Sequence, residues 1–251
     1  MRPIKDMSIL ITGGGSGLGL SAAEYFTARG AKVTISGRRA DKVQAAADAI
    51  GCAWVAGDVT VATERQAMID AALAHGGKLD VVINNAGNML RGPIDQLDEA
   101  ELIGVFHSNV VAAMMLTGLA VPHLAATQGA VVFVGSGHTR RSFPGASPYA
   151  ATKGAVQVLT QVLAAELGAQ RIRVNCVIPG GVLTELNVRA GFLSAEAAAE
   201  RQQAMLSMQA IPQIGTGEDI AEAMDYLARA EWVTGALLDV DGGLGLGVTY
   251  A

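Results

Sequence analysis

The sequence predicts an α/β fold: one domain with a doubly wound parallel sheet of about seven strands and helices on both faces. Half of the 251 residues are hydrophobic and only 16% are charged, which suits a sheet buried between two helix layers. Short apolar runs typical of buried strands alternate with segments of helical periodicity. No stretch has the composition of a linker, so we expect residues 1–251 to form a single domain.

The first expected strand, Ser8–Ile11, leads into the glycine-rich turn Thr12-Gly-Gly-Gly-Ser-Gly-Leu-Gly19. The helical pattern that follows ends near Gly30. Such a turn between a strand and a helix lets the backbone approach a pyrophosphate at the helix N-terminus. A flexible loop is the alternative, because the spacing Gly-x-x-x-Gly-x-Gly differs from the commonest dinucleotide fingerprint. The flanking strand and helix favour phosphate binding.

The second expected strand, Lys32–Gly37, is followed by two arginines. Dinucleotide folds that prefer NAD place an acid in this region to bind the ribose 2′-hydroxyl. Arg38 and Arg39 instead offer guanidinium groups, which bind a 2′-phosphate by charge and forked hydrogen bonds. A solvated basic turn is the alternative. We therefore expect NADP(H) as the cofactor, with NAD(H) as the second choice.

Polar residues occur near the ends of the next two expected strands. The third, Ala53–Val59, contains Asp58, which could reach an adenine amino group or lie in an exposed turn. The fourth, Leu79–Ile83, precedes Asn84-Asn85-Ala86-Gly87. Ligands of open α/β sheets bind at the carboxyl ends of the strands, although asparagine and glycine also favour simple turns.

A helical pattern over Leu102–Leu124 contains a single asparagine in an apolar, methionine-rich surface. A buried asparagine needs hydrogen-bond partners, so Asn109 is either a structural bracket or a polar relay. The most apolar part, Val110–Ala120, is too short to span a bilayer and precedes Pro122. We therefore expect no membrane span.

The fifth expected strand, Ala130–Val134, places Ser136 at a carboxyl edge, ahead of a helix that Tyr149 opens. Positions i and i+4 of a helix lie on one face, so the Tyr149 phenol and the Lys153 ammonium should point the same way. A fixed cation favours phenolate and should lower the tyrosine pKa, which suits a general acid or base. A solvated helix face could carry the same pair of residues.

The sixth expected strand, Arg171–Ile178, leads to Pro179-Gly-Gly-Val-Leu-Thr184. Residues 185–212 then break the alternation of strands and helices. An insertion at this edge is well placed to cover a ligand, and ordinary packing is the alternative. A helix over Glu218–Ala230 and a seventh strand within Gly235–Gly243 complete the pattern.

Composition and spacing also argue against several classes of protein. The net charge of −5 and the pI near 5.4 do not suit a nucleic-acid surface. Cys52 and Cys176 lie far apart without a pairing pattern, and no signal peptide is recognisable, so we expect reduced thiols in a cytoplasmic protein. The four histidines show no metal-ligand spacing, so no metal site is expected.

Taken in order, these motifs resemble those of the short-chain dehydrogenase/reductase family, whose fold is Rossmann-like. The resemblance extends from about Met7 to Gly243. The matching pieces are Thr12-Gly-x-x-x-Gly17-x-Gly19, Asn84-Asn-Ala-Gly87, Asn109, Ser136, Tyr149-x-x-x-Lys153, Pro179-Gly180 and Asp241-Gly-Gly243. Each is weak alone, but the ordered set is specific. Ser16 departs from the basic residue that many NADP-dependent members have there, whereas Arg38 matches the family's other basic position.

The resemblance implies a role for each candidate catalytic residue. Tyr149 would exchange a proton with a carbonyl or alcohol oxygen, and Ser136 would hydrogen-bond that oxygen. Lys153 would bind the nicotinamide ribose and lower the tyrosine pKa, while Asn109 would hold a water that links Lys153 to solvent. The residues expected to bind the cofactor are Gly13, Ser16, Gly17, Leu18, Gly19, Arg38, Arg39, Asp58, Val59, Asn85, Ala86, Gly87, Tyr149, Lys153, Pro179, Gly180, Val182 and Thr184. Substrate specificity should depend on His138, on 143–147 and on the 185–212 cover.

We therefore expect an NADP(H)-dependent reductase of small-molecule ketones or aldehydes, or an alcohol dehydrogenase working in reverse. The alternatives are an NAD-dependent alcohol or sugar-alcohol dehydrogenase and a 3-oxoacyl carrier-protein reductase. For the last, Arg140 and Arg141 could contact an anionic partner, although a solvated pair is the simpler interpretation. A non-catalytic dinucleotide sensor on the same fold is a further alternative, which the presence of Ser136, Tyr149 and Lys153 disfavours.

The resemblance also implies a homo-oligomer, a dimer or tetramer formed through the helices that contain Asn109 and Tyr149. Both helices are rich in small and apolar residues. Burial inside one subunit would produce a similar composition, so both interpretations stay open.

Overall fold

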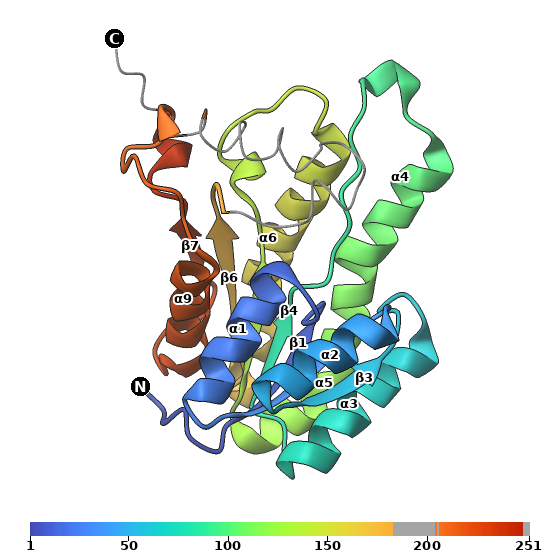
Figure 1. Cartoon of the computed structure of the whole chain (residues 1–251), viewed down its shortest axis with the longest axis vertical. Coiled ribbons are helices and arrows are strands. Elements are labelled where there is room, and N and C mark those ends of the chain that lie inside the picture. The colour runs from blue at the N-terminus through green and yellow to red at the C-terminus, as the bar shows by residue number, and fades with distance from the viewer. Residues whose placement is uncertain (183–203, 205, 248–251) are drawn as a thin grey trace.

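The computed structural model describes residues 1–182, 204 and 206–247. Seven parallel strands form one sheet in the order β3-β2-β1-β4-β5-β6-β7 (Figure 1). The strands are β1 Ser8–Thr12, β2 Lys32–Gly37, β3 Ala53–Ala56, β4 Val81–Asn84, β5 Ala130–Val134, β6 Arg173–Pro179 and β7 Leu237–Val240. The α-helices with described bounds are α1 Gly17–Ala28, α2 Ala40–Ile50, α3 Ala62–Gly76, α4 Glu99–Phe106, α5 Ala112–Thr127, α6 Ser147–Leu167 and α9 Gly217–Arg229.

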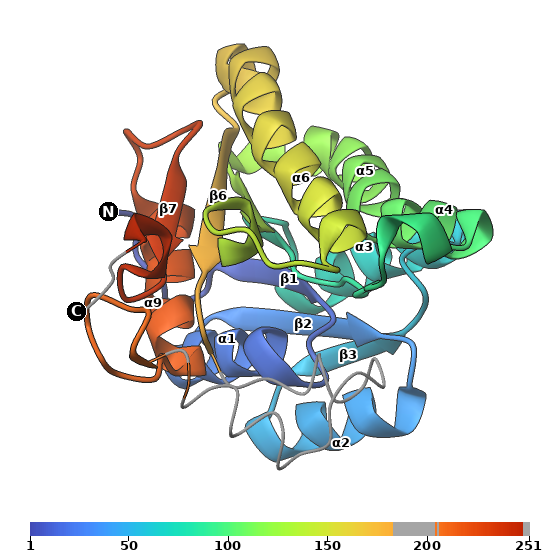
Figure 2. The ribbon, with the colours of Figure 1, turned by 90° about the horizontal axis from the view of Figure 1, so that it is seen from above.

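Helices cover both faces of the sheet, as Figure 2 shows, with α1, α2 and α9 on one face and α3, α5 and α6 on the other. Alternate residues of a strand point to opposite faces. In β1, Ile9 and Ile11 accordingly pack in the core beneath α1 and α9, while Leu10 packs beneath α3 and α5. All three are fully buried. The predicted doubly wound parallel sheet is confirmed.

The order of the strands reverses at the centre of the sheet. β1 pairs with β2 on one side and with β4 on the other, so that Ile9 lies opposite both Val33 and Val81. Successive strands run outward from this point in both directions. The loops that leave β1 and β4 therefore separate above the carboxyl edge and leave a crevice there.

One helix is longer at both ends than its sequence pattern indicated. The helix expected over Leu102–Leu124 extends over Glu99–Thr127, because α4, a π-helical turn at His107–Val111 and α5 form one continuous helix. This helix has 29 residues and contains an 18-residue window with a mean hydropathy of 1.7, so by length and composition alone it could cross a membrane. That is a weak indication, since a core helix passes the same test, and α5 packs against the sheet through Leu116, Ala120 and Leu124. Packing of this kind compensates for the helical hydrogen bond that proline removes.

Other elements differ from expectation mainly at their ends. The strand β3 ends at Ala56, so Asp58 lies in the loop beyond the strand instead of at its end. The helix α6 begins at Ser147, two residues before Tyr149, and has Pro148 in its first turn, where no amide hydrogen bond is lost. Tyr149 and Lys153 thus lie in the first two turns of α6, directly at the carboxyl edge of the sheet.

Candidate active site

Two adjoining cavities lie at the carboxyl edge, where the strand order reverses. They measure about 190 and about 700 Å³ and share Gly13, Ser16, Ala86, Gly87 and Met89 in their walls. The first cavity also contacts Ser136, Tyr149 and Lys153, and six further expected cofactor-binding residues: Gly17, Leu18, Asn85, Pro179, Gly180 and Val182. The second contacts Arg38, Arg39, Asp58 and Val59. The fold therefore brings residues from across the sequence together along one cleft.

Some of the expected residues do not line these cavities. Gly19 lies behind the glycine turn, and Asn109 lies behind the wall that Gly87 forms. Thr184 lies outside the described residues, as do 185–203 and 205 of the expected substrate cover.

The glycine-rich turn forms a cradle whose glycines are packed too closely to carry side chains. Gly13 has a φ of +67°, a conformation that favours glycine. A Cβ on Gly19 would lie 2.4 Å from the Gly13 carbonyl oxygen and 2.5 Å from Asn85 Nδ2. The N-cap residue of α1, Ser16, makes no side-chain capping bond to the first amides of the helix. The donors at this helix N-terminus are therefore suited to a phosphate group.

Hydrogen bonds tie this turn to the end of β4. Asn85 Nδ2 donates to the carbonyl oxygens of Thr12 at 2.8 Å and Gly13 at 3.2 Å. Thr12 Oγ1 accepts from the backbone amides of Asn85 at 3.1 Å and Ala86 at 3.0 Å. Asn85 thus positions the cradle, and its side-chain nitrogen is already engaged. Thr12 is a functional residue absent from the expected set, although its place directly before the glycines could have indicated it.

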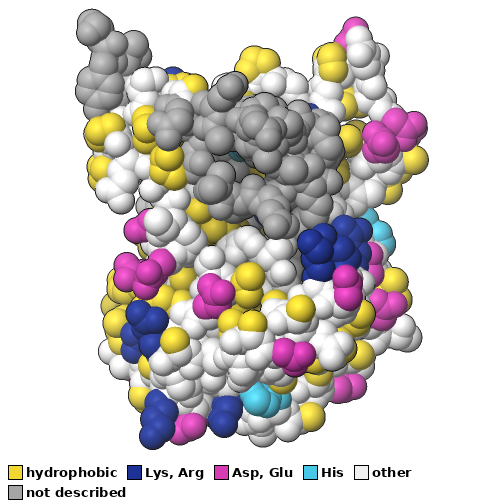
Figure 3. Space-filling view, in the orientation of Figure 1, with side chains coloured by type: hydrophobic (Ala, Val, Ile, Leu, Met, Phe, Trp, Pro, Cys, Tyr) yellow, Lys and Arg dark blue, Asp and Glu magenta, His cyan; other side chains and the backbone are white. Residues whose placement is uncertain are grey.

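Basic side chains line the other end of the cleft, and Figure 3 shows a patch of Lys and Arg side chains on this face of the molecule. Arg38 is 57% exposed; its Nη2 donates to Asn88 Oδ1 at 3.2 Å, and its Nη1 lies 3.9 Å from Asp58 Oδ2. Arg39 and Lys42 lie in the same wall. These contacts are long and exposed, so the Arg38 guanidinium keeps donors for an anionic ligand.

The Asp58 carboxylate borders the second cavity and is held in a local turn. Its Oδ1 accepts from the backbone amide of Thr60 at 2.9 Å and from the Thr60 hydroxyl at 2.7 Å. Partial burial raises the pKa of the Asp58 carboxyl, but the Thr60 bonds and the Arg38 charge together outweigh it and lower the pKa. The carboxylate is therefore ionised at neutral pH. The adenine contact of Asp58 stays a prediction.

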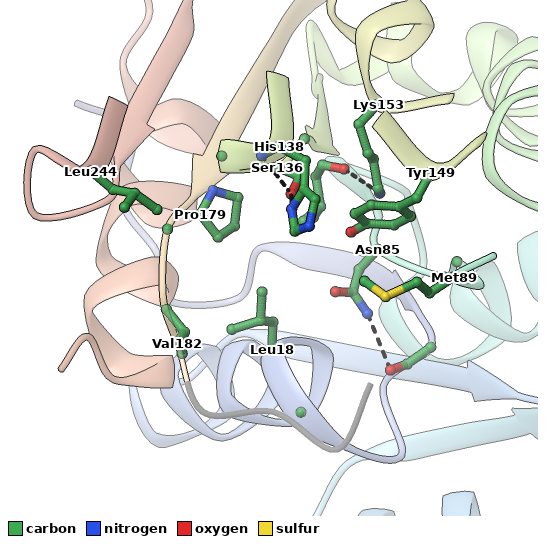
Figure 4. A pocket seen from close by; sticks show the side chains of 18 of the residues that line it. Leu18, Asn85, Met89, Ser136, His138, Tyr149, Lys153, Pro179, Val182 and Leu244 are labelled. Atoms are coloured by element: carbon green, nitrogen blue, oxygen red, sulfur yellow. Dashed lines mark hydrogen bonds between the residues drawn. The ribbon is translucent and has the colours of Figure 1, made fainter. Parts of the chain in front are cut away.

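Ser136, Tyr149 and Lys153 converge on the first cavity, as Figure 4 shows. Ser136 follows β5, and the other two belong to α6; all three are less than 9% exposed. Lys153 Nζ donates to the Val134 carbonyl oxygen at 2.7 Å and lies 5.7 Å from the centre of the Tyr149 ring. The i, i+4 alignment of Tyr149 and Lys153 expected from the sequence is therefore present.

The expected lowering of the Tyr149 pKa is not found in this structure. Burial raises the pKa of the phenol above its ordinary value, and a hydrogen bond with Ser136 and the Arg91 charge oppose this only in part. Burial also lowers the pKa of Lys153 to about 8, while the nearby Cys176 opposes the change. Removing a group from water disfavours its charged form, and here that effect exceeds the attraction between neighbours.

Asn109 lies in the π-helical turn, and its side chain is fully hydrogen-bonded. Its Oδ1 accepts from the Asn88 amide at 2.7 Å and the Ser108 hydroxyl at 3.0 Å. Its Nδ2 donates to the Asn88 carbonyl at 2.8 Å and to Thr152 Oγ1 at 3.0 Å. The side chain links Asn88, Ser108 and Thr152 and so acts as a structural bracket. The water expected beside Asn109 stays a prediction.

Several residues at the substrate end were not singled out from the sequence. Met89 and Leu244 line the first cavity together with the expected His138 and Phe143. Arg91 Nη2 lies 2.8 Å from His138 Nε2. Met89 and Arg91 follow a strand's carboxyl end, which is a usable signal, whereas nothing in the glycine-rich sequence around Leu244 indicates its position.

The two arginines after Ser136 are engaged inside the protein. Arg140 donates to Asp239 at 2.7 Å and to Gln157 at 2.9 Å, and Arg141 donates to the Met208 carbonyl at 3.3 Å. The simple solvated pair expected from the sequence is therefore wrong for Arg140. Both cysteines are free thiols, with Cys176 buried and Cys52 half-buried. Among the described residues, no three His, Cys, Asp or Glu side chains form a group that could hold a metal ion.

Comparison with known proteins gives a consistent picture. The family model described as short chain dehydrogenase matches residues 7–191. An uncharacterised oxidoreductase of Methylorubrum extorquens is 31% identical over 97% of this chain and 100% of its own length. A Streptomyces violaceoruber protein, whose name places it among the ketoacyl reductases of granaticin polyketide synthase, is 34% identical over 93% of this chain and 94% of its own. Hydroxynaphthalene reductase of Aspergillus fumigatus is 30% identical over 93% and 90%.

Solved structures agree with these matches. A short-chain dehydrogenase/reductase of Caenorhabditis elegans, described as containing a cofactor, superposes with a TM-score of 0.92 at 28% identity and covers 98% of each chain. A short-chain type dehydrogenase/reductase of Mycobacterium ulcerans gives a TM-score of 0.88 at 32% identity and covers 98% of this chain and 92% of that one.

Proposed function

Because the chain belongs to the short-chain dehydrogenase/reductase family, whose members are NAD(P)(H)-dependent oxidoreductases, we propose that it interconverts a carbonyl compound and the corresponding alcohol with NADP(H). One observation carries the proposal. The side chains of Ser136 and Tyr149 border a cavity that adjoins the glycine cradle, so a reacting oxygen and a bound dinucleotide can share one cleft.

The residues of the cleft fit the dinucleotide along its length. The amides at the N-terminus of α1 would hold the pyrophosphate, because the turn before them leaves room for no side chain. Arg38 and Arg39 would bind a 2′-phosphate at the basic end. Lys153 would bind the ribose of the nicotinamide, near Gly87, which leaves space beside its ammonium group. When bound, the nicotinamide supplies the hydride chemistry.

Side chains of the protein would supply the proton and bind the carbonyl oxygen of the substrate. During reduction, the Tyr149 hydroxyl gives its proton to the carbonyl oxygen, and Ser136 donates a hydrogen bond to the same oxygen. The raised pKa of Tyr149 keeps the phenol protonated at neutral pH, which is the form that reduction needs. Removing Ser136 or Tyr149 would leave the developing negative charge on the oxygen with only one of its two fixed donors.

The walls of the first cavity favour a substrate with apolar or aromatic groups beside the carbonyl. Met89, Phe143, Val182 and Leu244 supply apolar surface. The names of two relatives, a ketoacyl reductase and a hydroxynaphthalene reductase, also indicate carbonyl reduction. The alternative of a carrier-protein substrate gains no support from Arg140, since that side chain is paired with Asp239 and Gln157.

A panel of ketones, aldehydes and alcohols, assayed with NADPH, NADH, NADP⁺ and NAD⁺ through nicotinamide absorbance, tests the proposal directly. Turnover with NADPH and an aromatic ketone is expected. Tyr149→Phe should lower kcat at least about 100-fold and leave the dissociation constant for NADPH within about twofold, because only the proton donor is lost. Full activity of that variant would overturn the assignment of Tyr149.

The cofactor preference has its own test. Arg38→Ala should raise the KM for NADPH by about 10- to 100-fold, since a charge-assisted hydrogen bond contributes about 1.5–3 kcal/mol. The KM for NADH should stay within about threefold. Arg29→Ala is the matched control, because that exposed arginine lies at the far end of α1. Equal effects of Arg38→Ala on both cofactors would refute the phosphate contact.

We also propose that the protein is a homo-oligomer. Large apolar side chains remain exposed on α4 and α5, including Ile103 and Met115, and on α6, including Val158 and Val162. The helix α6 contacts α4 and the π-helical turn that joins α4 to α5, so the residues belong to adjoining surfaces. A second copy of the chain would remove that area from water, which is the usual reason for an exposed apolar helix face.

A further inference from the structure

The proposed reaction requires Ser136 to donate a hydrogen bond to the carbonyl oxygen. A serine hydroxyl has one proton and two lone pairs, and its proton can rotate to suit any neighbour. If the proton turned toward another acceptor, the hydroxyl would present a lone pair to the carbonyl oxygen and repel it. Something in the site has to fix the direction of this bond.

Arg91 determines which nitrogen of His138 carries a proton. Its Nη2 lies 2.8 Å from His138 Nε2. A guanidinium group can only donate hydrogen bonds, so Nε2 must offer its lone pair. A neutral imidazole has one proton, and that proton then belongs to Nδ1. Arg91 is itself oriented by a contact from its Nε to Met89 Sδ at 3.3 Å.

His138 in turn fills the acceptor positions of Ser136. Its Nδ1 lies 3.1 Å from Ser136 Oγ, and with the proton on Nδ1 this nitrogen is the donor. The backbone amide of His138 donates to the same oxygen at 3.3 Å. Both lone pairs of the hydroxyl are then used, so its own proton is free only to donate. Ser136 also lowers the pKa of the Tyr149 phenol, partly offsetting burial, as a hydroxyl that donates toward the phenol oxygen does.

Ring contacts hold His138 in this orientation. Its ring centre lies 4.7 Å from that of Phe143 and 5.3 Å from that of Tyr149, with the Tyr149 ring nearly perpendicular at 88°. Both distances are typical of packed aromatic pairs. Figure 4 shows the imidazole beside Ser136, with the bond between them drawn. A half turn of the ring would put Cδ2 and Cε1 where Nδ1 and Nε2 now lie, and would break the bonds to both Ser136 and Arg91.

We propose that Arg91 and His138 are positioning residues that make Ser136 an obligate hydrogen-bond donor. The chain of bonds runs in one direction, from Arg91 through His138 to Ser136 and on to the substrate oxygen. The inference rests on the proposed function for its catalytic consequence. The direction of the bonds, however, is a property of the protein alone and can be measured without any substrate.

The first test is nitrogen-15 NMR of the protein labelled on histidine, since the shifts of the two ring nitrogens identify the tautomer. The His138 signals are assigned by their loss in His138→Phe, with three other histidines as references. We expect a neutral ring with the proton on Nδ1. In Arg91→Met the proton should move to Nε2 in much of the population, whereas Arg91→Lys, which keeps a donor-only head group, should retain Nδ1–H. A wild-type ring with its proton on Nε2, or a tautomer unaffected by Arg91→Met, would overturn the inference.

The second test asks whether His138 acts through Ser136. His138→Phe keeps an aromatic ring but loses both nitrogens, and should lower kcat/KM for the carbonyl about 10- to 100-fold with the NADPH dissociation constant unchanged. His138→Asn places an amide donor near the position of Nδ1 and should recover most of that loss. His75→Phe on the exposed surface of α3 is the matched control.

A double-mutant cycle separates positioning from packing. In a Ser136→Ala background, His138→Phe should have no further effect on kcat/KM, because the hydroxyl that it orients is absent. An equal fall in both backgrounds would show that the ring acts by another route and would refute the proposal. An inactive wild-type protein would refute the proposed function alone, since the tautomer measurement would still stand.

Discussion

Replacing Lys153 with methionine should make the protein more stable, although it removes a group that the proposed reaction uses. Burial lowers the pKa of Lys153 from 10.5 to about 8. In the folded protein its charged form is therefore about 3 kcal/mol less favourable than in the unfolded chain. Methionine has a similar length and no charge to desolvate. The substitution also removes the hydrogen bond from Lys153 Nζ to the Val134 carbonyl, which lowers the free energy of unfolding by about 1 kcal/mol.

The net gain at pH 7 is therefore about 2 kcal/mol in the free energy of unfolding, or about 4–8 °C in Tm for a chain of this size. The gain should depend on pH in a defined direction. Below about pH 8 both the folded and the unfolded wild type hold the lysine proton, so the full penalty applies. Between about pH 8 and 10.5 only the unfolded chain holds it, so wild-type stability rises with pH. Above 10.5 the penalty is gone.

Chemical denaturation of wild type and Lys153→Met at several values between pH 7 and pH 10.5 measures this difference. The gap between the two proteins should be largest at pH 7 and should close as the pH rises. Lys42→Met is the matched control, because Lys42 is exposed on α2 and should show neither the gain nor its pH dependence. A variant no more stable than wild type at pH 7, or a gap that does not change with pH, would refute the argument from burial.

Three further predictions concern the cradle, the phenol and the apolar helix face. Gly19→Ala should destabilise the fold by about 1–3 kcal/mol and weaken NADPH binding at least about tenfold, because its Cβ would lie 2.4 Å from a backbone oxygen. Denaturation measures the loss of stability, and titration with NADPH measures the loss of binding. The control is Gly104→Ala, whose Cβ would have nothing within 4 Å and which should be neutral or stabilising. The phenolate absorbance that Tyr149→Phe removes should titrate above pH 10 in the protein without ligand, and a midpoint below 10 would contradict burial as the dominant cause. Val158→Glu should reduce the mass measured by light scattering to that of a smaller species, while Gln44→Glu on α2 should not; an unchanged mass for Val158→Glu would exclude α6 as an interface.

The parallel sheet could be predicted because its strands are buried on both faces. A strand such as Ala130–Val134 has no exposed side, so its sequence is continuously apolar and easily recognised. The helix expected over Leu102–Leu124 extends over Glu99–Thr127, and packing against the sheet stabilises it in spite of Pro122. Local sequence reports local preference and says little about the packing that overrides it.

The residues of the candidate site likewise fall into those that the sequence predicts and those that only the structure brings together. Ser136, Tyr149, Lys153 and the glycine turn could be predicted, because each follows a strand or opens a helix in a recognisable motif. Arg91 could not be paired with His138 in advance, since 47 residues separate them and neither lies in a periodic element that fixes its direction. Met89 and Leu244 line the same cavity although they lie far apart in the sequence, so no local pattern could have paired them.

The sequence by itself determined the layered α/β architecture, the order of its elements and the chemical groups available at the carboxyl edge. These depend on apolar periodicity and on turns, which are properties of neighbouring residues. Only the tertiary structure decided how those groups are charged and which way their hydrogen bonds run. Burial raises the pKa of Tyr149 and lowers that of Lys153. The proximity of Arg91 to His138 determines which ring nitrogen of His138 carries the proton and donates to Ser136. Desolvation and hydrogen-bond direction depend on everything packed around a group, and most of that comes from distant parts of the chain.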